Sequence, residues 1–182
     1  IGLNPSGRFR FVTYNFGAGL RLYGCDGVSR AFEFDGQVFV PLTTGMLSDT
    51  PAHIAAHKNH LFLAFGHSLQ HSAIGDPYNW TPILGAGELN MGDRITNLLV
   101  MPGEQQNSAL ACFSRNSTRL LYGNSSADWQ MTTLRNDAGA WPHTAQYVDT
   151  AYVLDDRGVT NLAAVDAFGN FLVADTYSRN ES

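Results

Sequence analysis

The spacing of hydrophobic residues along the chain has a period of two, which predicts β-strands rather than helices. Residues 9–14 alternate in this way, as do residues 20–23, 31–34 and 38–40. Asp26-Gly27 and Asp35-Gly36 interrupt the pattern, and these pairs favour tight turns because glycine adopts positive φ without steric cost. Four strands joined by short turns predict an antiparallel meander.

The four-strand pattern recurs three more times, so we expect four units at about residues 8–50, 51–92, 93–140 and 141–180. The strands expected in the later units are 53–57, 60–65, 69–73 and 87–90; 95–101, 109–113, 119–122 and 130–134; and 145–148, 151–154, 160–165 and 171–174. Repeats of roughly 40–48 residues with four short strands each are typical of propeller blades. The predicted fold is therefore all-β, a β-propeller-like array of four-stranded antiparallel meander blades, with a β-sandwich as the alternative.

One segment could instead begin a helix, because Asp49 or Thr50 could cap it and Pro51 would lie in its first turn. The register of the repeat favours a strand there. Both chain ends suggest an excerpt of a longer protein: residue 1 is Ile in turn-like sequence, and residues 177–182 directly follow a strand-like run. A complete small domain with ragged termini is the alternative interpretation.

Composition narrows the classes of protein. A hydrophobic fraction of 44% with 15% charged residues predicts a folded core rather than disorder. The net charge of -5 argues against a surface that grips nucleic-acid phosphates. No apolar run approaches the ~20 residues of a membrane-spanning helix. Cys25 and Cys112 lie far apart in the sequence, so we expect free, buried thiols.

The histidines raise the question of a metal site. His53, His57 and His60 follow one another at intervals of four and three residues, and His67 and His71 come next. On a helix the first two would share a face, as in zinc sites. On a strand they would stand ~13 Å apart, too far to chelate one ion. We therefore expect turn and edge-strand histidines, some titrating near pH 6, and no metal site.

The sequence shows no catalytic constellation. It lacks a Gly-x-Ser-x-Gly nucleophile motif, and the glycines at 17–19 and 85–87 lack the rest of a phosphate-binding loop. A glycosidase needs a pair of carboxylates. The candidates are Glu33, Asp35, Glu88 and Asp93, but no motif singles out any two of them. Asp35 and Asp93 stand beside turn residues, where aspartate caps its own backbone. No catalytic residue and no cofactor is predicted.

The most specific segment spans residues 74–93. It contains Gly75, Asp76, Pro77 and Trp80, and it ends on Gly92 and Asp93. Asp-Pro starts a turn because the carboxylate accepts a backbone N–H and proline presets φ. We expect Trp80 to be a large apolar plug, mostly buried between neighbouring sheets.

A parallel segment follows one unit later, at residues 119–130. Arg119 and Tyr122 lie on a predicted strand, a polar turn follows, and Asp128 and Trp129 end the segment. The two tryptophans are expected at equivalent positions of successive blades, both largely buried between them. A third turn is expected at Asp156-Arg157-Gly158.

These motifs resemble the β-propeller region of bacteriophage tail proteins, namely the nozzle or tail tubular B-type proteins of short-tailed phages. The shared pattern is Gly-Asp-Pro-x-x-Trp at 75–80, Gly-Asp-x-Ile at 92–95, Arg-x-Leu-Tyr at 119–122 and the 156–158 turn. The resemblance covers most of the chain, but it defines a blade type rather than a chemistry. The histidine-rich stretch 53–71 departs from the family pattern.

The resemblance implies a structural protein of the virion tail. Such proteins assemble as homo-oligomeric rings, usually hexamers, below the portal and its adaptor, and they form the conduit for genome ejection. Tail fibre or spike proteins are the implied outer partners, and no sequence-specific nucleic-acid binding is implied. Two other classes stay open: a propeller glycoside hydrolase, and a glycan- or receptor-binding propeller. The second would present an exposed Trp or Tyr in a concave polar groove.

Overall fold

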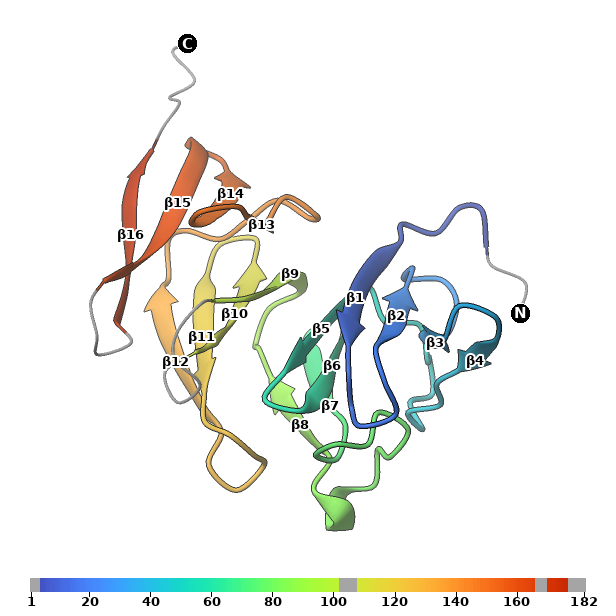
Figure 1. Cartoon of the computed structure of the whole chain (residues 1–182). Helices are drawn as coiled ribbons and strands as arrows, with labels where there is room; N and C mark the ends of the chain where they lie inside the picture. The colour runs from blue at the N-terminus through green and yellow to red at the C-terminus, as the bar shows by residue number, and fades with distance from the viewer. Residues whose placement is uncertain (1–3, 102–107, 166–169, 177–182) are drawn as a thin grey trace. The chain divides into compact units, whose positions relative to one another are not determined.

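The computed structural model describes residues 4–101, 108–165 and 170–176, with side chains as far as residue 162. Within these residues the chain forms sixteen β-strands and one short 3-10 turn, η1 (Pro82–Leu84) (Figure 1). The all-β prediction is confirmed, and the alternative helix is wrong because residues 53–57 form a strand. The turn-like residues 1–3 and the tail 177–182 lie outside the described residues. No helix in the described part is long and apolar enough to cross a membrane.

The strands form four antiparallel sheets of four strands, each a meander of sequence neighbours. Sheet 1 comprises β1 (Arg10–Tyr14), β2 (Arg21–Cys25), β3 (Phe32–Phe34) and β4 (Phe39–Pro41). Sheet 2 comprises β5 (His53–His57), β6 (His60–Phe65), β7 (Ser68–His71) and β8 (Gly87–Asn90). Sheet 3 comprises β9 (Ile95–Val100), β10 (Leu110–Ser114), β11 (Thr118–Tyr122) and β12 (Gln130–Arg135). Sheet 4 comprises β13 (Gln146–Tyr147), β14 (Ala151–Asp155), β15 (Gly158–Val165) and β16 (Asn170–Thr176).

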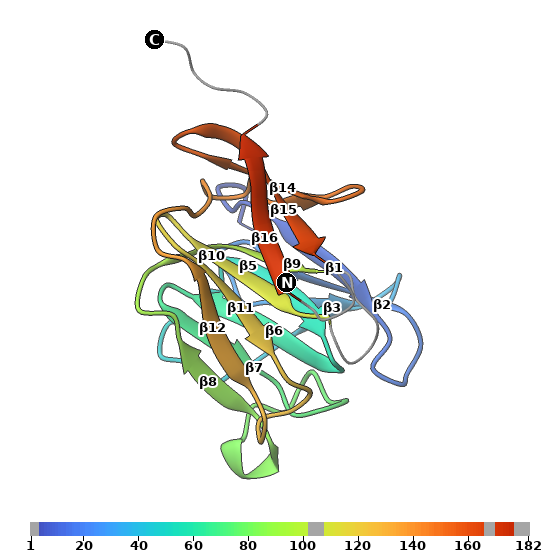
Figure 2. The same ribbon diagram turned by 90° about the vertical axis from the view of Figure 1, so that its left-hand side faces the viewer.

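Each strand falls where the alternating pattern predicts one, with ends shifted by a few residues. The meander order follows from the short connections, since antiparallel neighbours need only a tight turn. Figure 2 shows the strands of sheet 3 side by side in chain order.

The chain divides into two compact units. Unit 1 contains Ile1–Gly92 with Ser125–Ala127, and unit 2 contains Asp93–Asn124 with Asp128–Ser182. Unit 1 therefore holds sheets 1 and 2, and unit 2 holds sheets 3 and 4. The division after Gly92 falls where the sequence pattern passes from its second repeat to its third.

The core of unit 1 lies between sheet 1 and sheet 2. Tyr23 and Cys25 of β2 pack against Ile54 of β5 and against Leu61 and Leu63 of β6. Each fully buried leucine of this kind contributes about 1.5–3 kcal/mol to folding. Partly buried side chains extend the cluster: Val12, Tyr14, Phe16, Phe65 and Trp80.

Unit 2 repeats this arrangement with sheets 3 and 4. Ala111 and Phe113 of β10 and Leu120 of β11 pack against Ala151 and Val153 of β14. Most of the partners are small: Ala109, Ala140 and Ala145 belong to the same cluster. Small residues allow two sheets to approach closely around a few large side chains.

The cysteine prediction is confirmed. Cys25 and Cys112 are free and buried, one on β2 and one on β10. Burial is the main cause that raises the pKa of both thiols. They act as small hydrophobic residues rather than as reactive groups.

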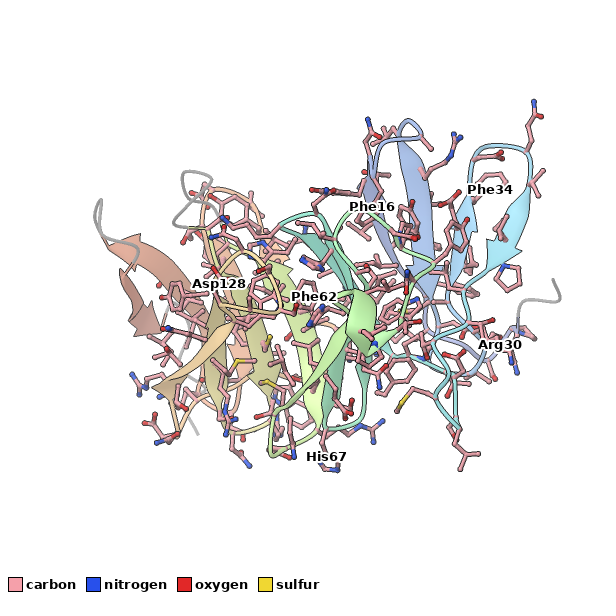
Figure 3. All side chains as sticks on the ribbon, turned by 90° about the horizontal axis from the view of Figure 1, so that it is seen from below. Phe16, Arg30, Phe34, Phe62, His67 and Asp128 are labelled. Atoms are coloured by element: carbon pink, nitrogen blue, oxygen red, sulfur yellow. The ribbon has the colours of Figure 1, made fainter. Side chains whose placement is uncertain are left out.

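The histidines differ most from expectation. The rings of His57, His60 and His71 surround Phe62 on sheet 2, with ring centroids 6.3, 6.3 and 5.6 Å from it (Figure 3 labels Phe62). All three are buried, at 3%, 1% and 2% exposure. Nδ1 of His60 and Nδ1 of His71 lie 2.6 and 3.0 Å from the carbonyl oxygen of Ser72.

The prediction of turn and edge-strand histidines is therefore wrong for His60 and His71, which lie on the two inner strands of the sheet. Exposed His67, in the β6–β7 turn, fits it. His57 does not share the titration near pH 6 expected of some histidines, because burial, with Lys58 and His60 nearby, lowers its pKa to about 4. In the described residues no group of three or more His, Cys, Asp or Glu could hold a metal ion.

We expect the stability of the protein to fall as the pH drops from about 6.5 towards 4. His57 has a folded-state pKa of about 4, whereas the unfolded value is about 6.5. In this window the unfolded chain binds the extra proton, so the loss reaches on the order of 2–3 kcal/mol. Urea unfolding of wild type and His57→Gln at pH 7 and pH 5 measures the effect.

The matched control is His67→Gln, which changes an exposed histidine of the same sheet. His57→Gln should weaken the pH dependence, and His67→Gln should keep it. An equal pH dependence in wild type and His57→Gln would contradict the assignment.

Candidate functional site

The Gly-Asp-Pro-x-x-Trp segment is a closed turn within unit 1. The Asp76 carboxylate accepts the backbone N–H of Tyr78 at 3.0 Å, and the Asp76 carbonyl accepts that of Asn79 at 3.3 Å. Gly75 adopts φ +73, and its N–H donates to the Asn59 carbonyl oxygen at 2.7 Å. The turn is thereby joined to the β5–β6 hairpin, whose residues Lys58 and Asn59 also have positive φ.

Trp80 is held by this turn. Its indole N–H donates to the carbonyl oxygen of Pro77 at 3.1 Å, and Pro77 is buried. The Trp80 ring packs against the core between sheets 1 and 2 but is only half-buried. The expectation of a mostly buried plug is met only in part, because the outer part of the ring reaches a cleft.

This cleft, which we call the Trp80 cleft, has two adjoining parts within unit 1. The larger has a volume of about 520 Å³ and the smaller about 230 Å³. Thr44, Gly45 and Trp80 line both parts. The larger part is also lined by Thr43, Asp76, Tyr78, Asn79 and Thr81, and the smaller by Met46, Gln70, His71, Pro82, Gly87 and Glu88.

One wall of the cleft is fixed by Asp49, which is buried. Its carboxylate accepts the Thr44 backbone N–H at 3.0 Å and the Thr44 hydroxyl at 2.7 Å. Arg30 pairs with the same carboxylate, with Nε 3.7 Å from Oδ2. The loop after β4 is therefore tied down at the point where it borders Trp80.

Glu33 is engaged in a local network rather than free for catalysis. The buried Tyr23 hydroxyl donates to its carboxylate at 2.7 Å, and Arg21 Nε lies 3.6 Å from the other oxygen.

Burial, followed by the charge of Glu33, raises the pKa of Tyr78 to about 12. Tyr78 is therefore a neutral hydrogen-bond donor at neutral pH.

Asp35 and Asp93, two more of the four candidate glycosidase carboxylates, cap turns, as expected. Asp35 accepts the N–H groups of Gln37 and Val38 at 2.8 and 2.7 Å. Asp93 accepts the N–H of Arg94 at 2.6 Å. These bonds to Asp35 are the largest cause that lowers its pKa.

Gly92 forms the turn before Asp93, with φ +74 and its N–H bonded to the Asn90 side chain at 2.8 Å. The fourth carboxylate, Glu88, is exposed on β8 and lines the smaller part of the Trp80 cleft. No pair of these carboxylates is joined by a described contact.

The segment 119–129, which begins on β11 of sheet 3, also builds a turn. Asp128 accepts the backbone N–H of Asn124 at 2.9 Å. Gly123 has φ +116, and a Cβ atom there would lie 2.6 Å from the Asp128 carbonyl oxygen and 3.0 Å from the Trp129 ring. Trp129 is half-buried, so the expectation for it is likewise met only in part.

Arg119 and Tyr122 are partly buried on β11, and Arg119 pairs with Cys112 of β10 across the sheet. Tyr122 packs against the unit 2 core, and burial raises its pKa. Both side chains belong to the packing of sheet 3.

The third predicted turn closes the β14–β15 hairpin. Gly158 has φ +121 and pairs with Asp155, whose carboxylate binds the backbone and the guanidinium of Arg157.

Asp156 in the same turn pairs with Arg115, whose guanidinium carbon stands 3.2 Å from the centroid of the Trp141 ring. Such a cation–π contact contributes about 0.5–1 kcal/mol at an exposed site.

The predicted residues thus lie on turns and strands of three sheets, and within neither unit do they form one catalytic centre. Only Asp76 and Trp80 of this set line the cleft. Three residues that line the cleft, Thr43, Tyr78 and Thr81, were not predicted from the sequence. Tyr78 could have been, because it occupies a variable position inside the Gly-Asp-Pro-x-x-Trp motif, close to Trp80.

In comparisons with known proteins, the chain matches no protein-family model and no curated protein.

We expect Gly123→Ala to destabilise unit 2 by about 3 kcal/mol. Positive φ costs a non-glycine residue about 1–2 kcal/mol, and the added methyl group would overlap the Asp128 carbonyl, which costs about 1–3 kcal/mol more. Urea unfolding followed by far-UV circular dichroism measures the loss.

Gly17→Ala is the matched control, because Gly17 has φ +120 and no atom within 4 Å of its added Cβ. It should show the backbone cost alone. Equal losses for the two variants would show that the Gly123 turn can relax and that the close approach has no energetic weight.

Proposed function

We propose that this protein is a structural component of a bacteriophage virion, part of the tail nozzle or neck ring through which the genome leaves the head. The observation that carries the proposal is the repetition of four-stranded meanders together with the Gly-Asp-Pro-x-x-Trp turn. In this proposal the four sheets are blades of a β-propeller, and the site residues support the blades rather than a reaction.

The outer face of sheet 1 supports further blade-like stacking. The side chains of Phe11, Phe32 and Phe39 meet there edge to face, with centroids 6.4 and 5.2 Å apart, and Phe34 stacks on Phe39 at 4.3 Å (Figure 3 labels Phe34). Gly24 gives them room, because a Cβ there would lie 2.6 Å from the Phe32 ring. Phe11 is 55% exposed and Phe39 is 40% exposed. An apolar face of this kind is suited to cover by one more sheet.

The charge distribution is suited to a wall that releases DNA. The chain has 11 basic residues against 16 acidic ones. Arg21, Arg30, Arg115, Arg135 and Arg157 are each paired with a carboxylate. Because affinity for DNA grows with each neutralised phosphate, an excess of acidic residues and arginines paired with carboxylates favour passage over retention.

The proposed partners are further copies of the chain in a closed ring, a hexamer, with a portal-proximal adaptor on one side and tail fibre or spike proteins outside. The proposed location is the virion tail. An alternative propeller enzyme has little support from the carboxylates, since three of the four candidates, Glu33, Asp35 and Asp93, are engaged in local bonds.

The proposed hexameric ring predicts the shape and size of the assembly in solution. The full-length protein, purified from its host particle or coexpressed with its adaptor, should form closed rings of about six copies. Negative-stain electron microscopy and light scattering measure this. A full-length protein that stays monomeric with and without the adaptor would overturn the proposal.

The aromatic face predicts exposed hydrophobic surface on the 182-residue chain. We expect concentration-dependent self-association and binding of an anilinonaphthalene dye, both reduced several-fold by Phe11→Asp. Leu20→Asp is the control, because Leu20 is 68% exposed and is not among the aromatic residues of this face. An equal response of the two variants, or no dye binding by wild type, would contradict the need for a covering sheet.

A further inference from the structure

The Trp80 cleft has the chemistry of a ligand site that the assembly role does not use. It combines aromatic rings, uncharged hydrogen-bonding groups and a volume of about 520 Å³ in its larger part. Small-molecule sites typically have about 300–1,000 Å³ and a few well-placed polar groups. We infer that this cleft binds a neutral saccharide.

The aromatic part of the site is set before any ligand arrives. The Trp80 ring is oriented by its bond to Pro77 and by the core beneath it, so the indole N–H is already used. Tyr78 is 45% exposed and borders the same part of the cleft. The C–H face of a pyranose ring is apolar and packs on such aromatic surfaces, while its hydroxyl groups point outward.

The polar part of the site offers both donors and acceptors. Asn79 uses its side-chain oxygen to accept the Thr81 N–H at 3.1 Å, which leaves its amide nitrogen as a donor. Thr43 and Thr81 are exposed threonines on the wall, and each brings a hydroxyl group. Asp76 has one oxygen bonded to the Tyr78 N–H, and its other oxygen can accept a sugar hydroxyl. Sugar hydroxyls need this mixture, because each both donates and accepts.

Charge selects among possible ligands. The described residues that line the cleft include Asp76 and Glu88 but no arginine or lysine. A phosphate, a nucleic acid or an acidic sugar would meet repulsion without a cation to pair with. An apolar ligand would bury the threonine hydroxyl and asparagine amide groups without giving them hydrogen-bond partners. A neutral saccharide satisfies both constraints.

The inference does not depend on the virion role, because it uses only unit 1 and its own side chains. A saccharide site would give a structural protein contact with a glycan surface. It would equally serve a free binding module. A result that overturns the virion role therefore does not overturn the saccharide site, and the reverse is also true.

The test measures binding of three neutral oligosaccharides, N-acetylated chitotriose, maltotriose and mannotriose, to the 182-residue chain. Saturation-transfer NMR and quenching of tryptophan fluorescence report contact and affinity. We expect at least one sugar to bind with a Kd of about 1 mM or tighter, which corresponds to about −4 kcal/mol. The affinity should not change between 50 and 500 mM NaCl, because no charge pairing is involved.

Tyr78→Ser should weaken the binding at least ten-fold. Tyr147→Ser is the matched control, because Tyr147 is a similarly exposed tyrosine, at 38%, on unit 2. It should bind as wild type does. Circular dichroism of both variants checks that the fold is kept, and Thr81→Arg, on the exposed rim, provides a second change that should block the cleft.

Three results would overturn the inference. One is failure of all three sugars to bind with a Kd of about 1 mM or tighter. Another is equal affinity in wild type, Tyr78→Ser and Thr81→Arg. The third is preferential binding of sialyllactose, inorganic phosphate or a neutral tetrapeptide, each offered under the same conditions.

Discussion

The structure of each unit depends on the burial of one sheet face against the next sheet along the chain. A four-stranded meander alone leaves both faces in water, and its net stability is marginal. In unit 1, Tyr23 and Cys25 meet Leu61 and Leu63, and the alternate positions Gly24 and Phe62 face the opposite side of each sheet. The strand register has to be kept for this, because a slip of one residue would turn every core side chain to the wrong face.

The turns protect that register, and aspartate is the residue that most of them use. Asp26, Asp35, Asp76 and Asp128 each accept backbone N–H groups close by in the sequence. These carboxylates are therefore occupied by local bonds. A chain with many acidic residues can in this way look rich in candidate catalytic groups while using them to terminate and join strands.

The Trp80 cleft arises where these two constraints meet. The turn at 75–80 has to close tightly, and in doing so it holds Trp80 half in the core and half out. The loop after β4, tied to Asp49, supplies the opposite wall. Because Trp80 is held by the packing of sheets 1 and 2 and by its bond to Pro77, its ring is oriented without any ligand, and such preorganisation lowers the cost of binding. A structural element and a binding surface can therefore share the same residues.

The sequence by itself determined the strands, the meander order and the turns, because each depends on a local property: alternation, short connections, or glycine and aspartate at a tight turn. The buried thiols of Cys25 and Cys112 followed from composition and spacing. Tertiary structure alone decided the depth of burial. Alternation shows which face a residue takes but not whether that face is covered, so His60 and His71 were expected at edges and are buried on inner strands. The same reason explains Trp80, because its partial exposure depends on how far the loop at Thr44 approaches it, a distance that no local pattern encodes.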